Sequence, residues 1–141
     1  MFVTHLSGPN GVNFEDTQLQ SPSWPDIEQA IQQLDGYHLN YLHLSRRKPN
    51  EEEYKSLTVA GGKAGLFFVY VTISHLNQPD QHFYLIDPSY PDKEDCWSFL
   101  VNQSDTECYR YEMSGIEATL EAAQNFAKTG ELDPSLTWEQ S

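Results

Sequence analysis

The chain has 141 residues, of which 21 are Asp or Glu and 8 are Lys or Arg, so its formal charge is −13 and its isoelectric point is near 4.5. Acidic chains with few apolar residues are usually disordered, but 38% of this chain is hydrophobic and 13% is aromatic, enough to form a core. Its negative surface disfavours direct binding of nucleic acid or of membrane head groups and favours basic protein partners.

The sequence predicts neither a targeting segment nor a membrane span. Residues 1–6 lack a basic segment followed by an apolar stretch, and no run of about 18 uncharged apolar residues occurs. We therefore expect one domain over residues 1–141, located in the cytoplasm. Cys96 and Cys108 lack a CxxC spacing, so reduced thiols are expected, with a bridge between neighbouring strands as the alternative.

The chain begins with a predicted strand and loop over residues 1–20, and a helix is predicted over residues 24–35. Apolar residues recur in that helix at i, i+3, i+4 and i+7, which indicates one buried face. They are Ile27, Ala30, Ile31 and Leu34. Ser23 and Asp26 form a predicted capping box, and Gly36 is expected to end the helix.

Strands are predicted where runs of β-branched and aromatic residues are separated by turn signals. These runs cover residues 39–44, 57–60, 66–73, 82–86, 97–101 and 108–113. The glycine cluster Gly61–Gly65 and the polar residues 102–105 are expected to turn two hairpins. The basic run Arg46–Lys48 and the acidic run Glu51–Glu53 indicate a solvated connection between strands.

A second helix is predicted after Ser114, which would cap it with Glu117 at the third position, and Gly130 is expected to end it. Its apolar stripe consists of Ile116, Leu120, Ala123, Phe126 and Ala127, and the tail carries Leu132, Leu136 and Trp138 as apolar anchors. Short turns between consecutive strands favour an antiparallel sheet. We therefore predict an α+β fold, with about five or six strands and both helices packed on one face of the sheet.

Motifs for catalysis and for cofactor binding are missing from the sequence. The five histidines form no HExxH pair, and the zinc-deaminase pattern is absent. The Gly61–Gly65 segment lacks phosphate-loop spacing and precedes a strand rather than a helix. We therefore expect no catalytic residue, no cofactor and no metal. A nucleophile that pairs Cys96 or Cys108 with a histidine is the alternative, because such partners meet only in the fold.

Three groups of carboxylates lie beside an aromatic residue in or near predicted loops. The candidates for partner binding are Glu51, Glu52, Glu53 and Tyr54, then Asp92, Glu94, Asp95 and Trp97, and finally Asp105, Glu107 and Tyr109. Aromatic anchors within a charged rim are common in protein recognition sites. The alternative is that the acids only keep the protein soluble while the aromatic side chains fill the core.

Three segments of the sequence form a recognisable combination. They are Trp24–Gly36, the hairpin at residues 57–69 centred on Gly61-Gly62, and Phe126-Ala127-Lys128-Thr129-Gly130-Glu131-Leu132 with Leu136 and Trp138-Glu139. Together they resemble the first family of immunity proteins from bacterial polymorphic toxin systems. The final segment is the most specific, and the resemblance covers most of the chain outside residues 87–112. Residues 87–112 contain two of the three acidic groups.

The resemblance implies a small cytoplasmic α+β protein that binds a cognate toxin and blocks it, sparing the producing cell and its kin. Toxins paired with this family include nucleic-acid deaminases and nucleases, whose basic clefts an acidic inhibitor can enter. The Phe126–Leu132 segment is expected to mark the fold, and Trp138 to anchor the tail on the core. Two other classes stay open, an acidic adaptor or scaffold for another basic protein and a small Cys/His enzyme.

Overall fold

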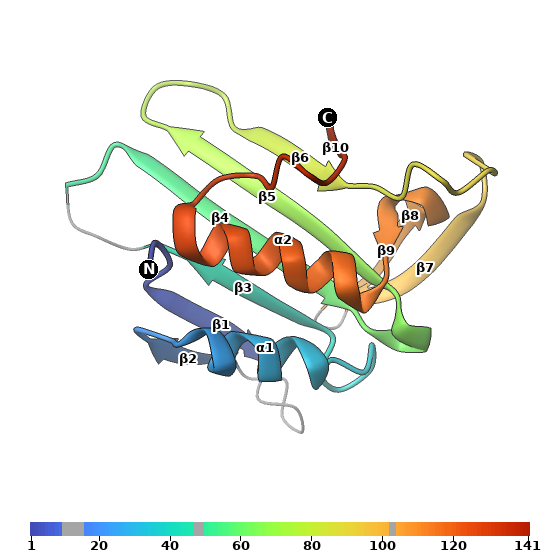
Figure 1. Ribbon diagram of the computed structural model, residues 1–141, viewed down its shortest axis with the longest axis horizontal. Helices are drawn as coiled ribbons and strands as arrows, with labels where there is room; N and C mark the ends of the chain where they lie inside the picture. Colours follow the sequence, from blue (N-terminus) through green and yellow to red (C-terminus); the bar gives the residue numbers. More distant parts are fainter. Residues whose placement is uncertain (10–15, 47–49, 102–103) are drawn as a thin grey trace.

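A computed structural model describes residues 1–9, 16–46, 50–101 and 104–141 (Figure 1). The helices are α1 (Trp24–Gln32) and α2 (Ile116–Thr129), with short 3₁₀ turns at Lys63–Gly65 and Arg110–Glu112. The strands are β1 (His5–Pro9), β2 (Asp16–Gln20), β3 (Tyr41–Ser45), β4 (Glu53–Gly61), β5 (Phe67–His75), β6 (Gln81–Leu85), β7 (Cys96–Val101), β8 (Ser104–Tyr109), β9 (Met113–Ser114) and β10 (Trp138–Gln140).

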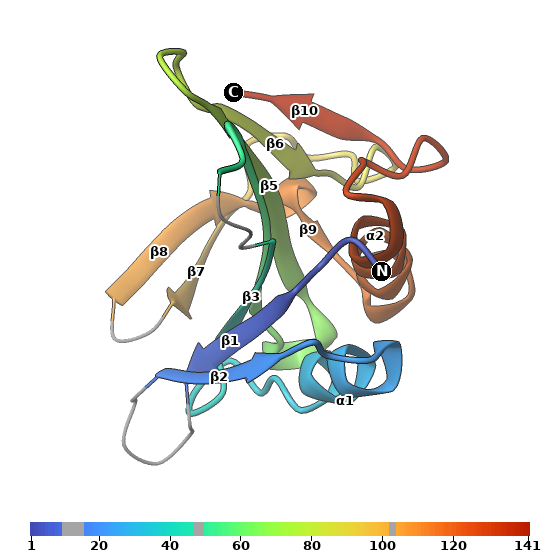
Figure 2. The ribbon, with the colours of Figure 1, turned by 90° about the vertical axis from the view of Figure 1, so that its left-hand side faces the viewer.

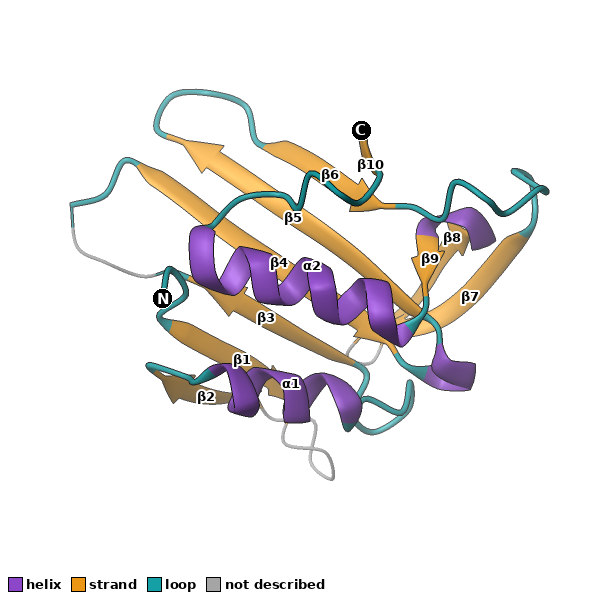
Figure 3. Cartoon of the chain, viewed as in Figure 1, coloured by secondary structure: helices purple, strands orange, loops and turns teal. Residues whose placement is uncertain are grey.

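The main sheet is antiparallel and has the strand order β10-β6-β5-β4-β3-β1-β2, with β9 paired to the end of β5. Both helices lie side by side on one face of this sheet (Figure 3), and β7 and β8 form a separate hairpin on the opposite face (Figure 2). The predicted α+β class and the placement of the helices are confirmed. The strands outnumber the prediction because three short segments, β2, β9 and β10, extend the sheet.

The main core lies between the sheet and the helices. Alternate residues of the strands point toward α1 and α2, and the fully buried ones include Leu44, Leu57, Val59, Val69 and Val71. Ile27 and Ile31 enter this core from α1, as the sequence predicts. On α2 the buried face is mostly alanine, which brings the helix close to the strands, and Phe126 is its one large buried side chain among the described residues.

The start of α1 is fixed by local hydrogen bonds, as predicted. The backbone N–H of Asp26 donates to the Ser23 hydroxyl at 3.3 Å, and the backbone N–H of Ser23 donates to the Asp26 carboxylate at 2.9 Å. The helix ends at Gln32, however, earlier than the predicted residue 35. The Asp35 carboxylate accepts the backbone N–H groups of Tyr37 and Leu39, so the chain turns away before it reaches Gly36.

The predicted cap of α2 at Ser114 is wrong. Ser114 lies in β9, where it pairs with Phe67 of β5, so its backbone already belongs to the sheet. Gly115 is the N-cap and provides no side-chain hydrogen bond. The other end follows the prediction, since Gly130 adopts the left-handed conformation at φ +74° and its N–H donates to the Phe126 carbonyl at 2.8 Å.

Two strand boundaries also differ from the prediction. β4 begins at Glu53 rather than at residue 57, and β8 covers Ser104–Tyr109 rather than residues 108–113. In β8 the charged residues Asp105 and Glu107 occupy alternate positions that face solvent, which a strand tolerates while its backbone pairs with a neighbour. In β4 Glu53 is exposed, whereas Lys55 is buried. The segment between residues 1 and 20 likewise contains β2 in addition to the predicted strand, and the intervening residues 10–15 lie outside the described residues.

The segment after α2 ties that helix to the sheet and to the N-terminus. Lys55 on β4 is buried, and its Nζ donates to the Gly130 carbonyl at 3.2 Å and to Glu131 Oε1 at 3.1 Å. Phe2 packs edge-on against Phe126, with ring centroids 5.8 Å apart. The Phe126–Leu132 segment, which carries part of the sequence resemblance, therefore connects α2 to the sheet and to the N-terminus.

The tail ends in β10, which adds an edge strand to the main sheet beside β6. Trp138 is half-buried against the main core, and its indole N–H donates to the Asp133 carbonyl at 3.1 Å. The predicted role of Trp138 as a tail anchor is consistent with these contacts. No helix among the described residues is long and apolar enough to cross a membrane.

Replacing Gly130 with alanine is expected to lower the free energy of unfolding by about 2 to 4 kcal/mol. A Cβ there would lie 2.8 Å from ring atoms of Phe2, in addition to the strain of the left-handed backbone. Gly65→Ala is the matched control, because Gly65 has φ +71° but no atom within 4 Å of the added Cβ, so only the backbone cost of about 1 to 2 kcal/mol is expected. If urea denaturation gave the same loss of unfolding free energy for both variants, the contact with Phe2 would be unimportant.

Candidate functional site

The β7–β8 hairpin stands out from the sheet face that lies opposite the helices, which we call the helix-free face (Figure 2). Its inner side carries Phe99 and Cys108, which form a second small core with Tyr41, Ala60 and Phe68 of the main sheet. The rings of Phe99 and Phe68 lie 5.4 Å apart. The hairpin is therefore packed onto the sheet and holds its outer side in a defined position.

The outer side of the hairpin is acidic and aromatic. Asp105, Glu107 and Tyr109 occupy alternate positions of β8 and are all exposed, Tyr109 at 44% of its surface. Neither carboxylate forms an ion pair among the residues that the structure describes. Tyr109 is supported from behind by Tyr111, whose ring stacks on it at 5.9 Å. The third predicted group is thus one continuous surface on a strand rather than a loop.

The loop between β6 and β7 is organised around Asp95. Its carboxylate accepts hydrogen bonds from the Tyr90 hydroxyl at 2.6 Å and from the Trp97 indole N–H at 3.2 Å. The guanidinium carbon of Arg110 lies 4.7 Å from the centroid of the Tyr90 ring, and the backbone N–H of Arg110 donates to the Asp95 carbonyl at 2.7 Å. Asp95 therefore shapes this loop.

The other members of the second group remain available on the loop surface. Asp92 and Glu94 are exposed, and the backbone N–H of Glu94 donates to the Asp92 carboxylate at 3.0 Å. Trp97 is 38% exposed, but it lies on the inner side of the hairpin with its register partner Cys108. We define the acidic hairpin surface as Asp92, Glu94, Asp105, Glu107 and Tyr109.

The hydrogen bonds from Tyr90 and then Trp97 lower the pKa of Asp95. A carboxyl whose pKa is depressed on folding adds stability above its unfolded pKa, about 3.9, and loses it as the pH falls through the lower folded value. We therefore expect the indole N–H NMR signal of Trp97 to stay constant from neutral pH down to about pH 4 and to move toward its unfolded position only below that. In Asp95→Asn the signal should be displaced already at neutral pH, and a wild-type position in that variant would contradict the role of Asp95.

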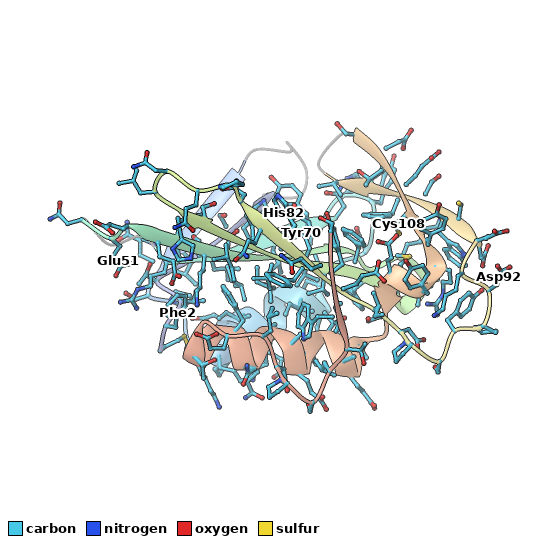
Figure 4. The ribbon with its side chains drawn as sticks, turned by 90° about the horizontal axis from the view of Figure 1, so that it is seen from above. Phe2, Glu51, Tyr70, His82, Asp92 and Cys108 are labelled. Carbon is cyan, nitrogen blue, oxygen red and sulfur yellow. The ribbon has the colours of Figure 1, made fainter. Side chains whose placement is uncertain are left out.

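Two members of the first group, at the β3–β4 turn, have basic neighbours in the same chain, whereas Glu52 forms no ion pair among the described residues. Glu51 pairs with Arg46 at 3.0 Å, and Glu53 lies 3.6 Å from Lys55 Nζ and 3.1 Å from His75 Nε2. Strand alternation places Tyr54 on the helix-free face and Glu53 on the opposite one. Figure 4 shows Glu51 and Asp92 at opposite ends of the molecule. The three predicted groups therefore form two separate surfaces.

Sequence reasoning missed the helix-free face of the main sheet. The register aligns two rows of side chains across β1, β3, β4, β5 and β6. The first row is His5, Ser45, Ser56, Thr72 and His82, and the second is Ser7, His43, Thr58, Tyr70 and Tyr84. Figure 4 shows Tyr70 and His82 on the side of the sheet away from Phe2 and the helices. The alternation of polar and apolar residues in each strand was the available signal.

Hydrogen bonds between imidazoles and hydroxyls order the side chains of this face. His43 Nδ1 and Thr58 Oγ1 are 2.6 Å apart, and His82 Nδ1 and Thr72 Oγ1 are 3.1 Å apart. The Tyr70 and Tyr84 rings lie 6.0 Å apart, and both also contact the Phe68 ring. Ser45 and Thr58 are buried within these rows, and the other side chains present ordered aromatic and polar groups without a carboxylate.

The two cysteines lie on opposite sides of the hairpin and cannot form a bridge in this arrangement. Cys96 pairs with Tyr109 on the outer side, while Cys108 pairs with Trp97 and points inward. Burial raises the pKa of Cys108 to about 12, so this thiol stays protonated at neutral pH. That protonation argues against Cys108 as the nucleophile of the enzyme alternative.

No group of three or more His, Cys, Asp or Glu side chains is arranged to hold a metal ion within the part of the chain that the structure describes. What the geometry offers instead is an exposed surface of carboxylates and aromatic rings on a rigid hairpin. Compared with known proteins, the chain matches no protein-family model and no curated protein, so its function is inferred from that surface.

Proposed function

We propose that the chain is an immunity protein, which binds a basic toxin domain in the bacterial cytoplasm and blocks its active-site cleft one to one. The toxin would be a nucleic-acid deaminase or nuclease, as the resemblance to the first family of immunity proteins implies. The observation that carries this proposal is the acidic hairpin surface, where the carboxylates of Asp105 and Glu107 have no cation partner among the described residues. A partner with a basic cleft would supply those cations.

The arrangement of these acids suits the imitation of a nucleic-acid strand. Asp105 and Glu107 alternate along β8, so their carboxylates recur about every 7 Å on one side of an extended strand. A nucleic-acid strand likewise presents regularly spaced negative charges to the cleft that binds it. Tyr109, exposed on the same side of β8, adds an aromatic ring of the kind that anchors protein interfaces.

Contacts within the chain hold the described strands of the hairpin and the adjoining loop in place without a partner. Phe99 fastens the inner side of the hairpin to Phe68, and the hydrogen bonds to Asp95 fix the adjoining loop. Ordering a mobile loop on binding costs free energy, so a hairpin that is already fixed can bind more tightly. Tighter binding mostly reflects slower dissociation, and lasting inhibition of a toxin depends on slow dissociation.

The test is to express the chain with the toxin domain encoded by the gene immediately upstream, and to measure both the mass of any complex and the toxin's activity. We expect a one-to-one complex in light scattering and loss of activity at equimolar inhibitor. The control is an unrelated basic protein whose net charge is similar to that of the toxin domain. It should not form a stable complex with the chain. Binding that leaves the toxin fully active would favour the adaptor alternative, and absence of binding would contradict the proposal.

A further inference from the structure

The acidic hairpin surface continues onto the helix-free face through a strip of tyrosines. Tyr109 stacks on Tyr111, and the Tyr111 hydroxyl donates to Glu139 Oε1 on β10 at 3.1 Å. Glu139 is the register partner of Tyr84, whose ring lies 6.0 Å from that of Tyr70. We call Tyr109, Tyr111, Tyr84 and Tyr70 the tyrosine strip. Tyr109 stacks on Tyr111 and Tyr84 lies beside Tyr70, and Glu139 links these two pairs.

The helix-free face differs in charge from the rest of this acidic molecule. Its two central rows contain ten residues and no carboxylate, although the chain as a whole has a formal charge of −13. The carboxylates stand around the face, with Glu139 at the β10 edge and Asp105 and Glu107 on the hairpin. An aromatic and neutral centre with a charged rim is the usual anatomy of a protein interface.

Tyrosine rings in this molecule already bind cations. Lys93 Nζ lies 4.7 Å from the centroid of the Tyr111 ring, and the Arg110 guanidinium lies at the same distance from the Tyr90 ring. A ring next to a carboxylate attracts a cation through both its face and the nearby charge. Tyr111 already holds Lys93 of the same chain, so the rings of the strip that are suited to arginine and lysine side chains of a partner are those of Tyr109, Tyr84 and Tyr70.

We infer that the helix-free face is the second half of the interface, and that the basic toxin domain lies along the tyrosine strip while the hairpin enters its cleft. This inference rests on the proposed function. The opposite face of the sheet is covered by α1 and α2. A second copy of the chain is disfavoured as the occupant, because both copies carry the same charge of −13 and repel each other. Charge complementarity thus selects a basic partner.

Hydroxyl-radical footprinting of the unmodified protein, alone and with the upstream-encoded toxin domain, tests the inference directly. We expect the oxidation rates of Tyr70, Tyr84 and His82 to fall severalfold in the complex. The rate at Trp24, which lies at the start of α1 on the other side of the sheet, should not change. This measurement needs no substitution, so it is independent of any effect on folding.

Two matched pairs of variants measure the contribution to affinity. Tyr84→Ala is expected to weaken binding about tenfold or more, whereas Leu76→Ala, at the exposed turn between β5 and β6, should change it less than about twofold. Thr72→Arg places a cation at the centre of the face and should also weaken binding about tenfold. Gln32→Arg makes the same change in charge at an exposed position of α1 and should have little effect on binding.

The outcomes separate this inference from the proposed function. Protection of Tyr70 and Tyr84, together with weaker binding of Tyr84→Ala, supports it. A tight complex in which neither tyrosine is protected and neither face variant loses affinity overturns the inference and leaves the immunity function standing. If the toxin domain does not bind at all, the proposed function fails and this inference fails with it.

Discussion

Replacing Phe126 with alanine is expected to lower the free energy of unfolding by about 3 to 5 kcal/mol, the largest loss of stability that we predict for a single substitution in this chain. Phe126 is 1% exposed, and its ring packs against Phe2 between α2 and the sheet. The remaining buried residues of α2 are small, so no neighbouring side chain on that helix can fill the cavity. Urea denaturation monitored by circular dichroism measures the change.

Leu76→Ala is the matched control for this substitution. Leu76 is 67% exposed, so its truncation should change the free energy of unfolding by less than about 0.5 kcal/mol. Ile31→Ala, at a fully buried position on α1, should cost about 2 to 4 kcal/mol. Leu120 only borders the core and is half-buried, so Leu120→Ala should cost less. A loss for Phe126→Ala as small as that for Leu76→Ala would mean that α2 does not pack as described.

Reversing Asp105 and Glu107 to lysine is expected to slow association with the toxin domain at least about tenfold at low ionic strength. These carboxylates stand without cation partners among the described residues, so they are available to attract a basic cleft. Added salt screens the attraction, and the difference from the wild type should therefore shrink as the salt concentration rises. Tyr109→Ala should instead speed dissociation, because an anchor acts after the encounter. Stopped-flow kinetics at several salt concentrations separates the two effects.

Glu117→Lys with Glu121→Lys is the control for the charge reversal. Both residues are exposed on α2, away from the hairpin, and the change in net charge is the same. Reversal of Glu51 and Glu53 should also have a smaller effect than reversal on β8, since cations of this chain already neutralise them. If the reversals on α2 and those on β8 slowed association equally, net charge alone would explain the effect. Rates that respond to neither, with binding indifferent to salt, would exclude the nucleic-acid mimic even for a genuine inhibitor.

The parts of the fold that follow from the sequence are those whose interactions are local. The cap of α1 needs only Ser23 and Asp26, three positions apart, and the turn at Gly130 needs only a residue that tolerates a positive φ. The apolar stripe of α1 reports its buried face because side chains one helical turn apart point the same way. The acidic and aromatic composition of residues 92–109 is likewise visible without any structure.

Other features depend on contacts between distant segments, and only the tertiary structure decides them. Ser114 belongs to the sheet because Phe67 pairs with it, a partner that no pattern around Ser114 reveals. Glu51 and Glu53 are already paired, whereas Asp105 and Glu107 are not, although the sequence presents them as similar acidic groups. The tyrosine strip exists because strand register and the packing of the hairpin bring β8, β10, β6 and β5 together. Local sequence sets which way each side chain points along its own strand, but the register between strands sets its neighbours, and those neighbours make the surface.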